Sequence, residues 1–261
     1  MMSEHAARRT FLIVAALLFA ASLTASVVGC RAMAAAGALL RPCGWTVTMG
    51  WTPMPGQSAA SAVASFLGMW TVMMVAMMLP SLMPVLWRCQ MSISRAGVRH
   101  VGRQIVLIGF SYFLAWSAVG FSALPLALTL GAVAAQLPAP GRDIPVVLGM
   151  VALVAGMLQF TAWKVRHLAH CRVADLWDRA PPVRVIDALG LGLHLGRHCM
   201  ASCVGATAIV IVTGGMDLVV MALVTGAITL ERLAPGGMRA AHLLGAAAMA
   251  AGGWLILGGA V

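Results

Sequence analysis

The sequence predicts an all-α integral membrane protein, a polytopic bundle of transmembrane helices that forms one domain over residues 1–261. Three observations predict this class. Hydrophobic residues make up 61% of the chain and charged residues only 9%, whereas a soluble domain carries about 25% charged residues. Several apolar stretches approach 20 residues, the length that crosses about 30 Å of hydrocarbon. The stretches are continuous and do not alternate like barrel strands, so helices must satisfy the backbone in lipid.

We expect seven spans, the sixth being short and bounded by an acid at each end. They cover residues 10–28, 61–87, 104–130, 144–163, 188–212, 216–230 and 240–258. With the N-terminus inside, basic residues gather before the first span and after the second, fourth and sixth. Only Arg31, Arg41 and Arg142 fall outside. The positive-inside rule therefore predicts an N-in, C-out topology.

The net charge of +10 would suggest nucleic acid in a soluble protein. Here the basic residues lie between apolar spans, which indicates topology and contact with an anionic lipid bilayer instead. We therefore expect no nucleic-acid partner. At the N-terminus, Arg8 and Arg9 precede an apolar run that fits either a signal peptide or an uncleaved anchor. The run is long for a signal peptide, which favours the anchor.

The second span carries methionines at helical spacing. Met73 and Met77 fall on one stripe, and Met74 and Met78 on a neighbouring stripe. Thioethers are soft ligands that suit Cu(I), although methionine also fills gaps between packed helices. Two prolines follow the stripes and predict a kink at the cytoplasmic end of this helix.

The fifth span holds two pairs of chemically active side chains. His194 and His198 share one face, and Cys199 and Cys203 share another, about 140° away. At most one pair can hold a given ion, so other helices must complete its coordination. His198 and Cys199 lie about 15 Å, and the methionines of the second span about 17 Å, from opposite membrane edges. A soft site near the midplane is possible; inert packed cysteines and a histidine–backbone network are the alternative.

A second cluster is predicted in the cytoplasmic loop after the fourth span. If the fourth helix continues this far, His167, His170 and Cys171 share one side. This could be a point of uptake or release for a soft metal, or an ordinary polar helix end. Near the end of the sixth span, Glu231 could pair with Arg232 or Arg197, or relay a proton.

These segments together resemble a bacterial family of predicted metal-binding integral membrane proteins, some of whose members are labelled copper chaperones. The resemblance covers about residues 70–235. Its first signature is residues 70–80 followed by Pro84, and its second is Lys164, His167, Cys171 and Arg172. The third is Gly196, Cys199, Ser202 and Cys203, then Met216-Asp217, then Glu231-Arg232.

The resemblance implies a multi-pass protein of the bacterial inner membrane that binds a metal ion, most plausibly Cu(I). Two positions depart from the family pattern. His167 replaces the first cysteine of the second signature and can still bind metal, whereas Ser202 cannot supply a thiolate. A site built on the family's cysteine count is therefore altered here.

The leading hypothesis is membrane metal handling, in which copper is transported, delivered or kept in balance, with a metal-receiving protein or a membrane complex as partner. One alternative is a thiol-redox oxidoreductase that uses Cys199 and Cys203, although their C-x3-C spacing is not the usual C-x-x-C. Another is a non-catalytic assembly subunit, for which Gly192 and Gly196 would allow close helix approach. Haem held by a histidine is a further alternative. The sequence favours a non-enzyme.

Overall fold

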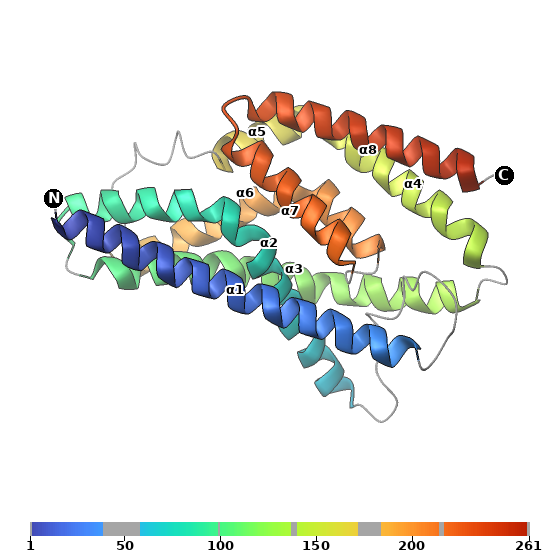
Figure 1. The fold of residues 1–261 in the computed structure, drawn as a ribbon, viewed down its shortest axis with the longest axis horizontal. Coiled ribbons are helices and arrows are strands. Elements are labelled where there is room, and N and C mark those ends of the chain that lie inside the picture. The colour runs from blue at the N-terminus through green and yellow to red at the C-terminus, as the bar shows by residue number, and fades with distance from the viewer. Residues whose placement is uncertain are drawn as a thin grey trace.

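The computed structural model describes residues 2–38, 58–98, 100–136, 140–171, 184–213 and 217–259, and every regular element in these ranges is an α-helix (Figure 1). The helices are α1 (Met2–Ala38), α2 (Ala59–Arg95), α3 (Val101–Gln136), α4 (Pro140–Leu158), α5 (Ala162–Cys171), α6 (Val185–Val212), α7 (Leu218–Leu233) and α8 (Gly237–Gly259). Arg172 and Met216, which belong to the resemblance, lie outside the described residues. The all-helical prediction is confirmed for the described part of the chain.

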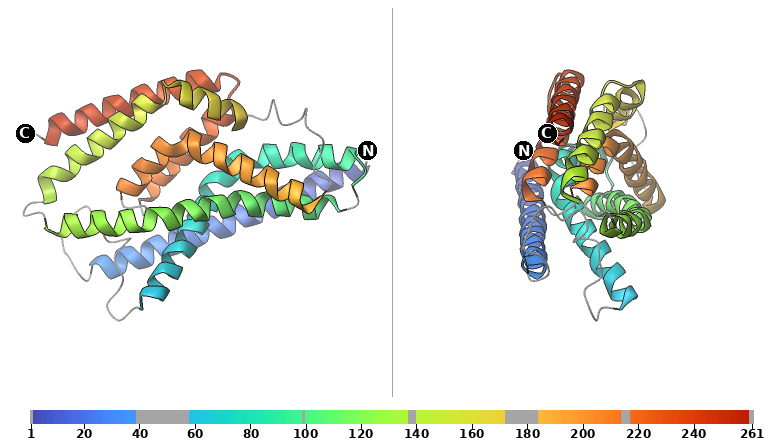
Figure 2. Two further views of the ribbon diagram at one scale, coloured as in Figure 1. Left: turned by 180° about the vertical axis from the view of Figure 1, so that it is seen from behind. Right: turned by 90° about the vertical axis from the view of Figure 1, so that its right-hand side faces the viewer.

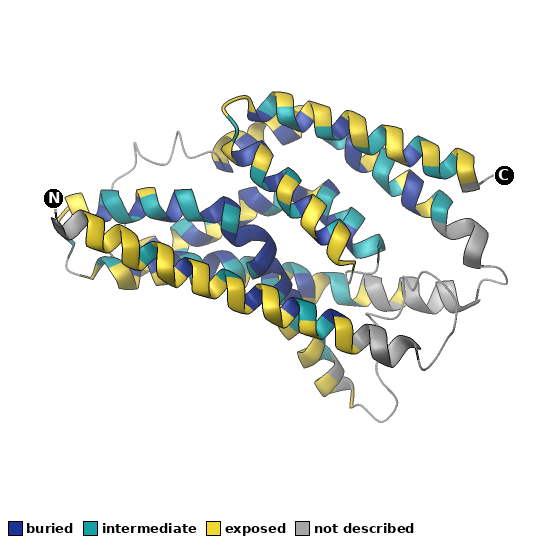
Figure 3. Cartoon of the chain, viewed as in Figure 1, coloured by how far each residue is buried: buried dark blue, intermediate teal, exposed yellow. Residues whose placement is uncertain are grey.

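Five of the described helices are long and apolar enough to cross a membrane, or six if α4 and α5 together form one broken span. Helix α7, with 16 residues, is too short to be counted among them. Large apolar side chains on the outside, such as Leu17, Leu243 and Trp254, are 65%, 72% and 74% exposed. Figure 3 shows α1 with one long exposed side. In lipid, such a surface faces hydrocarbon instead of water.

The predicted fourth span is wrong at its C-terminal end. Helix α4 stops at Leu158, and α5 begins at Ala162 after a bend of 71°. The bend has a local cause, because the backbone N–H groups of residues 159–161 bond three residues back in tight turns. The Thr161 hydroxyl then accepts a hydrogen bond from the Lys164 backbone N–H at 3.3 Å, as a helix cap does. Trp163 consequently belongs to α5.

Helices α2, α3 and α6 are locked together by a few specific contacts. The Trp70 indole N–H donates to the Trp116 carbonyl at 2.9 Å, and a Cβ at Gly120 would strike the Trp70 ring. Between α3 and α6, a Cβ at Gly192 would overlap Ser111 and the carbonyl of residue 108. Small residues thus let these helices approach closely. This approach brings side chains of α3 within reach of the buried face of α6.

The remaining helices pack around this centre. Helix α8 lies along α4 on one side of the molecule, as both views in Figure 2 agree, and Gly149 and Gly252 touch at that contact. Helix α1 packs along α2, with the Phe11 and Trp87 rings 5.4 Å apart. The ribbon of α2 bends part-way along its length (Figure 1), and the helix contains Pro80 and Pro84, as the predicted kink requires.

Candidate metal site

The centre of the site is the Cys199 thiol on α6, which is 0% exposed. The Tyr112 hydroxyl on α3 donates a hydrogen bond to Cys199 Sγ at 2.9 Å. On the other side, Cys199 Sγ lies 3.9 Å from the Met78 thioether sulfur on α2. Two soft sulfur atoms from different helices are therefore in direct contact inside the bundle.

Two more thiols lie close by and are linked through one hydroxyl. Ser202 Oγ is 3.7 Å from Cys171 Sγ on α5 and 3.6 Å from Cys203 Sγ on α6. The same hydroxyl donates to the Cys199 carbonyl at 2.9 Å. Cys171 and Cys203 are 5% and 2% exposed. We call Met78, Cys171, Cys199 and Cys203 the thiol cluster, and it draws on α2, α5 and α6.

A buried guanidinium adjoins the thiol cluster. Arg232, near the end of α7, is 8% exposed. It donates hydrogen bonds to Cys171 Sγ at 3.4 Å and to Ser81 Oγ at 3.2 Å. Its Nε has no hydrogen-bond partner, and no carboxylate of the described residues pairs with it. A positive charge inside the bundle thus faces sulfur atoms instead of an acid.

The neighbouring acid, Glu231, is occupied elsewhere. Its carboxylate accepts hydrogen bonds from Lys164 Nζ at 2.6 Å and from Gln159 Nε2 at 2.8 Å. The prediction that Glu231 pairs with Arg232 or Arg197 is wrong, because α7 directs Glu231 toward the bend between α4 and α5. Lys164 Nζ also donates to the Ser202 carbonyl at 2.8 Å. Lys164 and Glu231 form a buried ion pair, with side chains 5% and 4% exposed.

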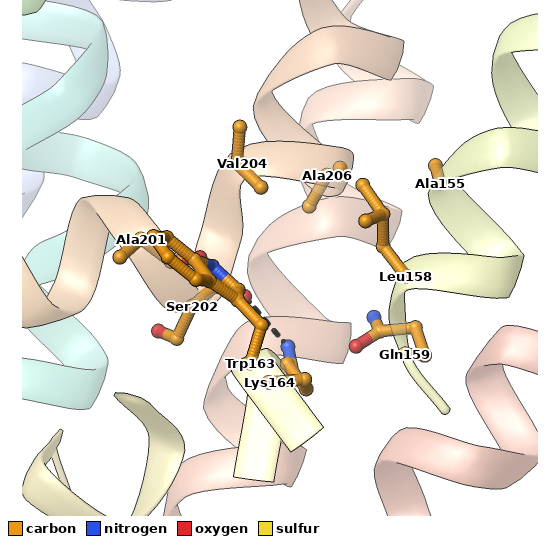
Figure 4. A pocket seen from close by; sticks show the side chains of 10 residues that line it. Ala155, Leu158, Gln159, Trp163, Lys164, Ala201, Ser202, Val204 and Ala206 are labelled. Atoms are coloured by element: carbon orange, nitrogen blue, oxygen red, sulfur yellow. Dashed lines mark hydrogen bonds between the residues drawn. The ribbon is translucent and has the colours of Figure 1, made fainter. Parts of the chain in front are cut away.

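Figure 4 shows the surroundings of Lys164, with its hydrogen bond to the Ser202 carbonyl drawn beside Trp163 and Gln159. The cavity there holds only about 10 Å³, the room of one water molecule at most. The Trp163 indole N–H donates to the Ala201 carbonyl at 3.0 Å. Helix α5 is thus fastened to the backbone of α6 at two consecutive carbonyls, which holds Cys171 next to Ser202.

The four predicted histidines form a separate group. His167 Nδ1 lies 2.9 Å from His198 Nδ1, and the His170 ring stacks on the His198 ring with centroids 4.4 Å apart. The His194 and His198 centroids are also 4.4 Å apart. We call His167, His170, His194 and His198 the histidine cluster. Cys171 was expected beside His167 and His170, but its thiol is turned toward Ser202 and Arg232. The reason is that Cys171 falls on the buried side of α5 with Lys164 and Leu168, whereas His170 is exposed.

The predicted methionines divide in the same way. Met73, Met74, Met77 and Met78 are all buried, being 1–3% exposed, in the apolar core with Trp70. Met78 is the member that contacts a thiol. Over the described ranges, moreover, no three side chains of histidine, cysteine, aspartate or glutamate are grouped so as to hold one metal ion. A soft site here must include the Met78 thioether.

The sequence analysis placed Arg232 as a partner for Glu231 and as part of the third signature, without a contact to the thiols, and it did not single out Tyr112. Tyr112 is the one tyrosine of the chain and lies within an apolar span, a signal that could have singled it out, because a buried hydroxyl needs a partner. The three signature segments meet in space. Cys199 contacts Met78, Arg232 contacts Cys171 and Ser81, and Lys164 pairs with Glu231.

Comparison with known proteins adds one finding. A family model described as "PpoB2: Copper chaperone" matches residues 67–255, which contain the whole thiol cluster and the buried charged residues Lys164, Glu231 and Arg232. No curated protein and no solved structure matches the chain.

Proposed function

Because this chain belongs to the PpoB2 copper chaperone family, we propose that it binds Cu(I) as cargo within the bundle and passes it to another protein. The observation that carries this proposal is the Arg232 guanidinium beside three thiols. A buried charge is costly unless it is paired, and in the described part of the chain Glu231 pairs with Lys164 instead. Cu(I) held by two thiolates carries one net negative charge, which matches the guanidinium.

The sulfur geometry supports the same proposal. Two sulfur atoms that each lie about 2.3 Å from one metal ion, at a trigonal angle, are about 4 Å apart. Cys199 Sγ and Met78 Sδ are 3.9 Å apart. Thiolates and thioethers are the soft donors that select Cu(I). Cys199 and Met78 are therefore the proposed nucleus of the site.

Cys171 and Cys203 are the proposed further ligands. Both adjoin Ser202 Oγ, at 3.7 and 3.6 Å, and the same hydroxyl donates to the Cys199 carbonyl at 2.9 Å. Ser202 itself supplies no thiolate and would only orient its neighbours. Tyr112 donates to Cys199 Sγ, and such a donor stabilises a negatively charged sulfur.

The histidine cluster is a proposed secondary position for the metal. Imidazole nitrogen is a harder donor than sulfur and also binds copper. His198 is the residue before Cys199 on α6, so the two clusters adjoin each other along this helix. Copper that leaves the thiol cluster would therefore meet the histidine cluster next. The rings now stack and bond to one another, so metal binding would require them to rotate.

We further propose the seven-span, N-in, C-out arrangement in the bacterial inner membrane. The arrangement of basic residues supports it, and α7 would be the sixth crossing. With 16 residues, α7 extends about 24 Å, so a crossing there needs a locally thin bilayer. Labelling single introduced cysteines in loops from each side of intact cells tests the topology. An N-terminus reached from outside would contradict it.

The test of copper binding is direct. The full chain, purified without oxygen and loaded with Cu(I), should retain near-stoichiometric copper by mass spectrometry. A Cys199→Ser/Cys203→Ser variant should lose most of that copper. Cys89→Ser is the matched control, because Cys89 is also a buried free thiol, 6% exposed, on α2 outside the thiol cluster. Copper equally retained by the double variant, or absent from the native chain, would refute the proposal.

A further inference from the structure

A second cavity, of about 150 Å³, adjoins the thiol cluster. Its described lining includes Ser81 and Arg88 from α2, Cys171 from α5 and Arg232 from α7. Arg88 is exposed, whereas Cys171 and Arg232 are buried. The cavity therefore connects an exposed positive charge to a buried thiol and a second positive charge.

The cavity contains a group that is ready for a ligand. Arg232 Nε is buried and has no hydrogen-bond partner, and leaving a buried donor unsatisfied is unfavourable. The other guanidinium nitrogens donate to Ser81 Oγ and Cys171 Sγ. An anion that entered the cavity would meet Arg232 beside the thiol. The described lining residues include two guanidinium groups and no acid, and this favours negatively charged molecules.

The thiol specifies which anion. Phosphate and lipid headgroups form no bond with the Cys171 thiol, whereas a Cu(I) complex can exchange one of its ligands for that thiol. The volume also bears on size, because at about 10–15 Å³ for each water a cavity of about 150 Å³ holds on the order of ten water molecules. That space admits copper with its sulfur atoms, with Arg88 beside it.

We propose that this cavity takes up copper as an anionic complex of Cu(I) with a small thiol, and that Cys171 is the first ligand of the protein to bind the metal. The proposal rests on the function proposed above. In the exchange, Cys171 S–H gives up its proton as its sulfur bonds to copper. One carrier thiolate breaks its bond to copper and leaves with that proton as the free thiol. Copper stays Cu(I), and the complex keeps its single negative charge at the metal.

The test compares two copper donors on the full chain in a mild neutral detergent without oxygen. One donor is Cu(I)–glutathione, which is anionic, and the other is tetrakis(acetonitrile)copper(I), which is a cation. Copper retained by the protein is measured against time after rapid desalting. In Arg88→Gln, uptake from Cu(I)–glutathione should slow about tenfold, while the final copper content stays as in the native chain and uptake from the cationic donor does not slow.

Two variants serve as controls. Arg88→Lys keeps the charge and should take up copper from both donors at the native rate. Arg95→Gln removes an exposed arginine from the same helix, seven residues beyond Arg88 and outside the cavity, and should also leave both rates unchanged.

The outcomes separate this inference from the proposed function. Suppose that both donors load the native chain fully. If Arg88→Gln then takes up copper from Cu(I)–glutathione as fast as the native chain, or is slowed equally with both donors, the inference is overturned and the proposed function is not. Uptake from Cu(I)–glutathione is also measured with excess inorganic phosphate or excess free glutathione. If phosphate slows the uptake as much as glutathione does, the cavity is a general anion site and the inference is overturned. If neither donor loads the native chain, the proposed function itself fails.

Discussion

Cys199 and Met78 are 121 residues apart in the sequence, yet their sulfur atoms lie 3.9 Å apart at the centre of the bundle. Neither residue is exposed by more than 1%. The contact joins α2 to α6, and Tyr112 adds a hydrogen bond to Cys199 from α3. This contact makes specific predictions about copper affinity and about the packing that maintains it.

The Met78 thioether should matter for copper and little for folding. Met78→Leu keeps the side-chain volume, so the free energy of unfolding should fall by less than about 1.5 kcal/mol, whereas loss of one soft ligand should weaken Cu(I) binding at least tenfold. Affinity is measured by competition with a Cu(I) chelator. Met74→Leu is the control, because Met74 is equally buried on the same helix and lies outside the thiol cluster. Equal affinities in the two variants would exclude Met78 as a ligand.

Ser202 offers a gain of function. Its hydroxyl lies 3.7 and 3.6 Å from Cys171 Sγ and Cys203 Sγ, so Ser202→Cys would place a further thiol between them. We expect Cu(I) affinity to rise about tenfold, since a thiolate is a far better Cu(I) ligand than a hydroxyl. Ser202→Ala, measured in the same competition, should leave affinity near the native value. An affinity unchanged in Ser202→Cys would indicate that copper does not bind at this place.

The buried ion pair should behave as a unit. Lys164→Met or Glu231→Gln alone should reduce the free energy of unfolding by about 3–5 kcal/mol, because the partner charge is left buried and unpaired. The double variant should recover part of that loss. Thermal unfolding in detergent measures all three. If the losses of the single variants simply add in the double variant, the two side chains do not interact in the folded protein.

The close contact between α3 and α6 should depend on Gly192. A Cβ there would overlap Ser111 and the carbonyl of residue 108, so Gly192→Ala should lower the unfolding free energy by about 1–3 kcal/mol. Gly190 lies two residues earlier on α6 with nothing within 4 Å of an added Cβ. Gly190→Ala should therefore be neutral or slightly stabilising. The two variants are compared by thermal unfolding, and equal unfolding temperatures would contradict the proposed packing.

Much of the fold follows from local pattern. Continuous apolar runs predicted helices, and the described helices fall where the runs do, with ends that differ by several residues. The exception is the bend after Leu158, where Thr161 caps a new helix within an apolar stretch. Composition alone gives no sign of such a bend, because a hydropathy average does not distinguish the residues at which the helical hydrogen-bond pattern is interrupted.

The sequence by itself determined the helical class, the long apolar runs, the soft residue types and the segments that carry them, because these depend on composition and on helical period. Only the tertiary structure decided which of them meet. The Cys171 thiol contacts Arg232 and not the histidines, and Glu231 pairs with Lys164 and not with Arg232 or Arg197. The physical reason is that the bend before α5, the glycine-lined approach of α3 to α6 and the position of α7 set these contacts. The contacts Arg232–Cys171 and Lys164–Glu231 each join residues that are far apart in the chain, and spacing along one helix does not encode them.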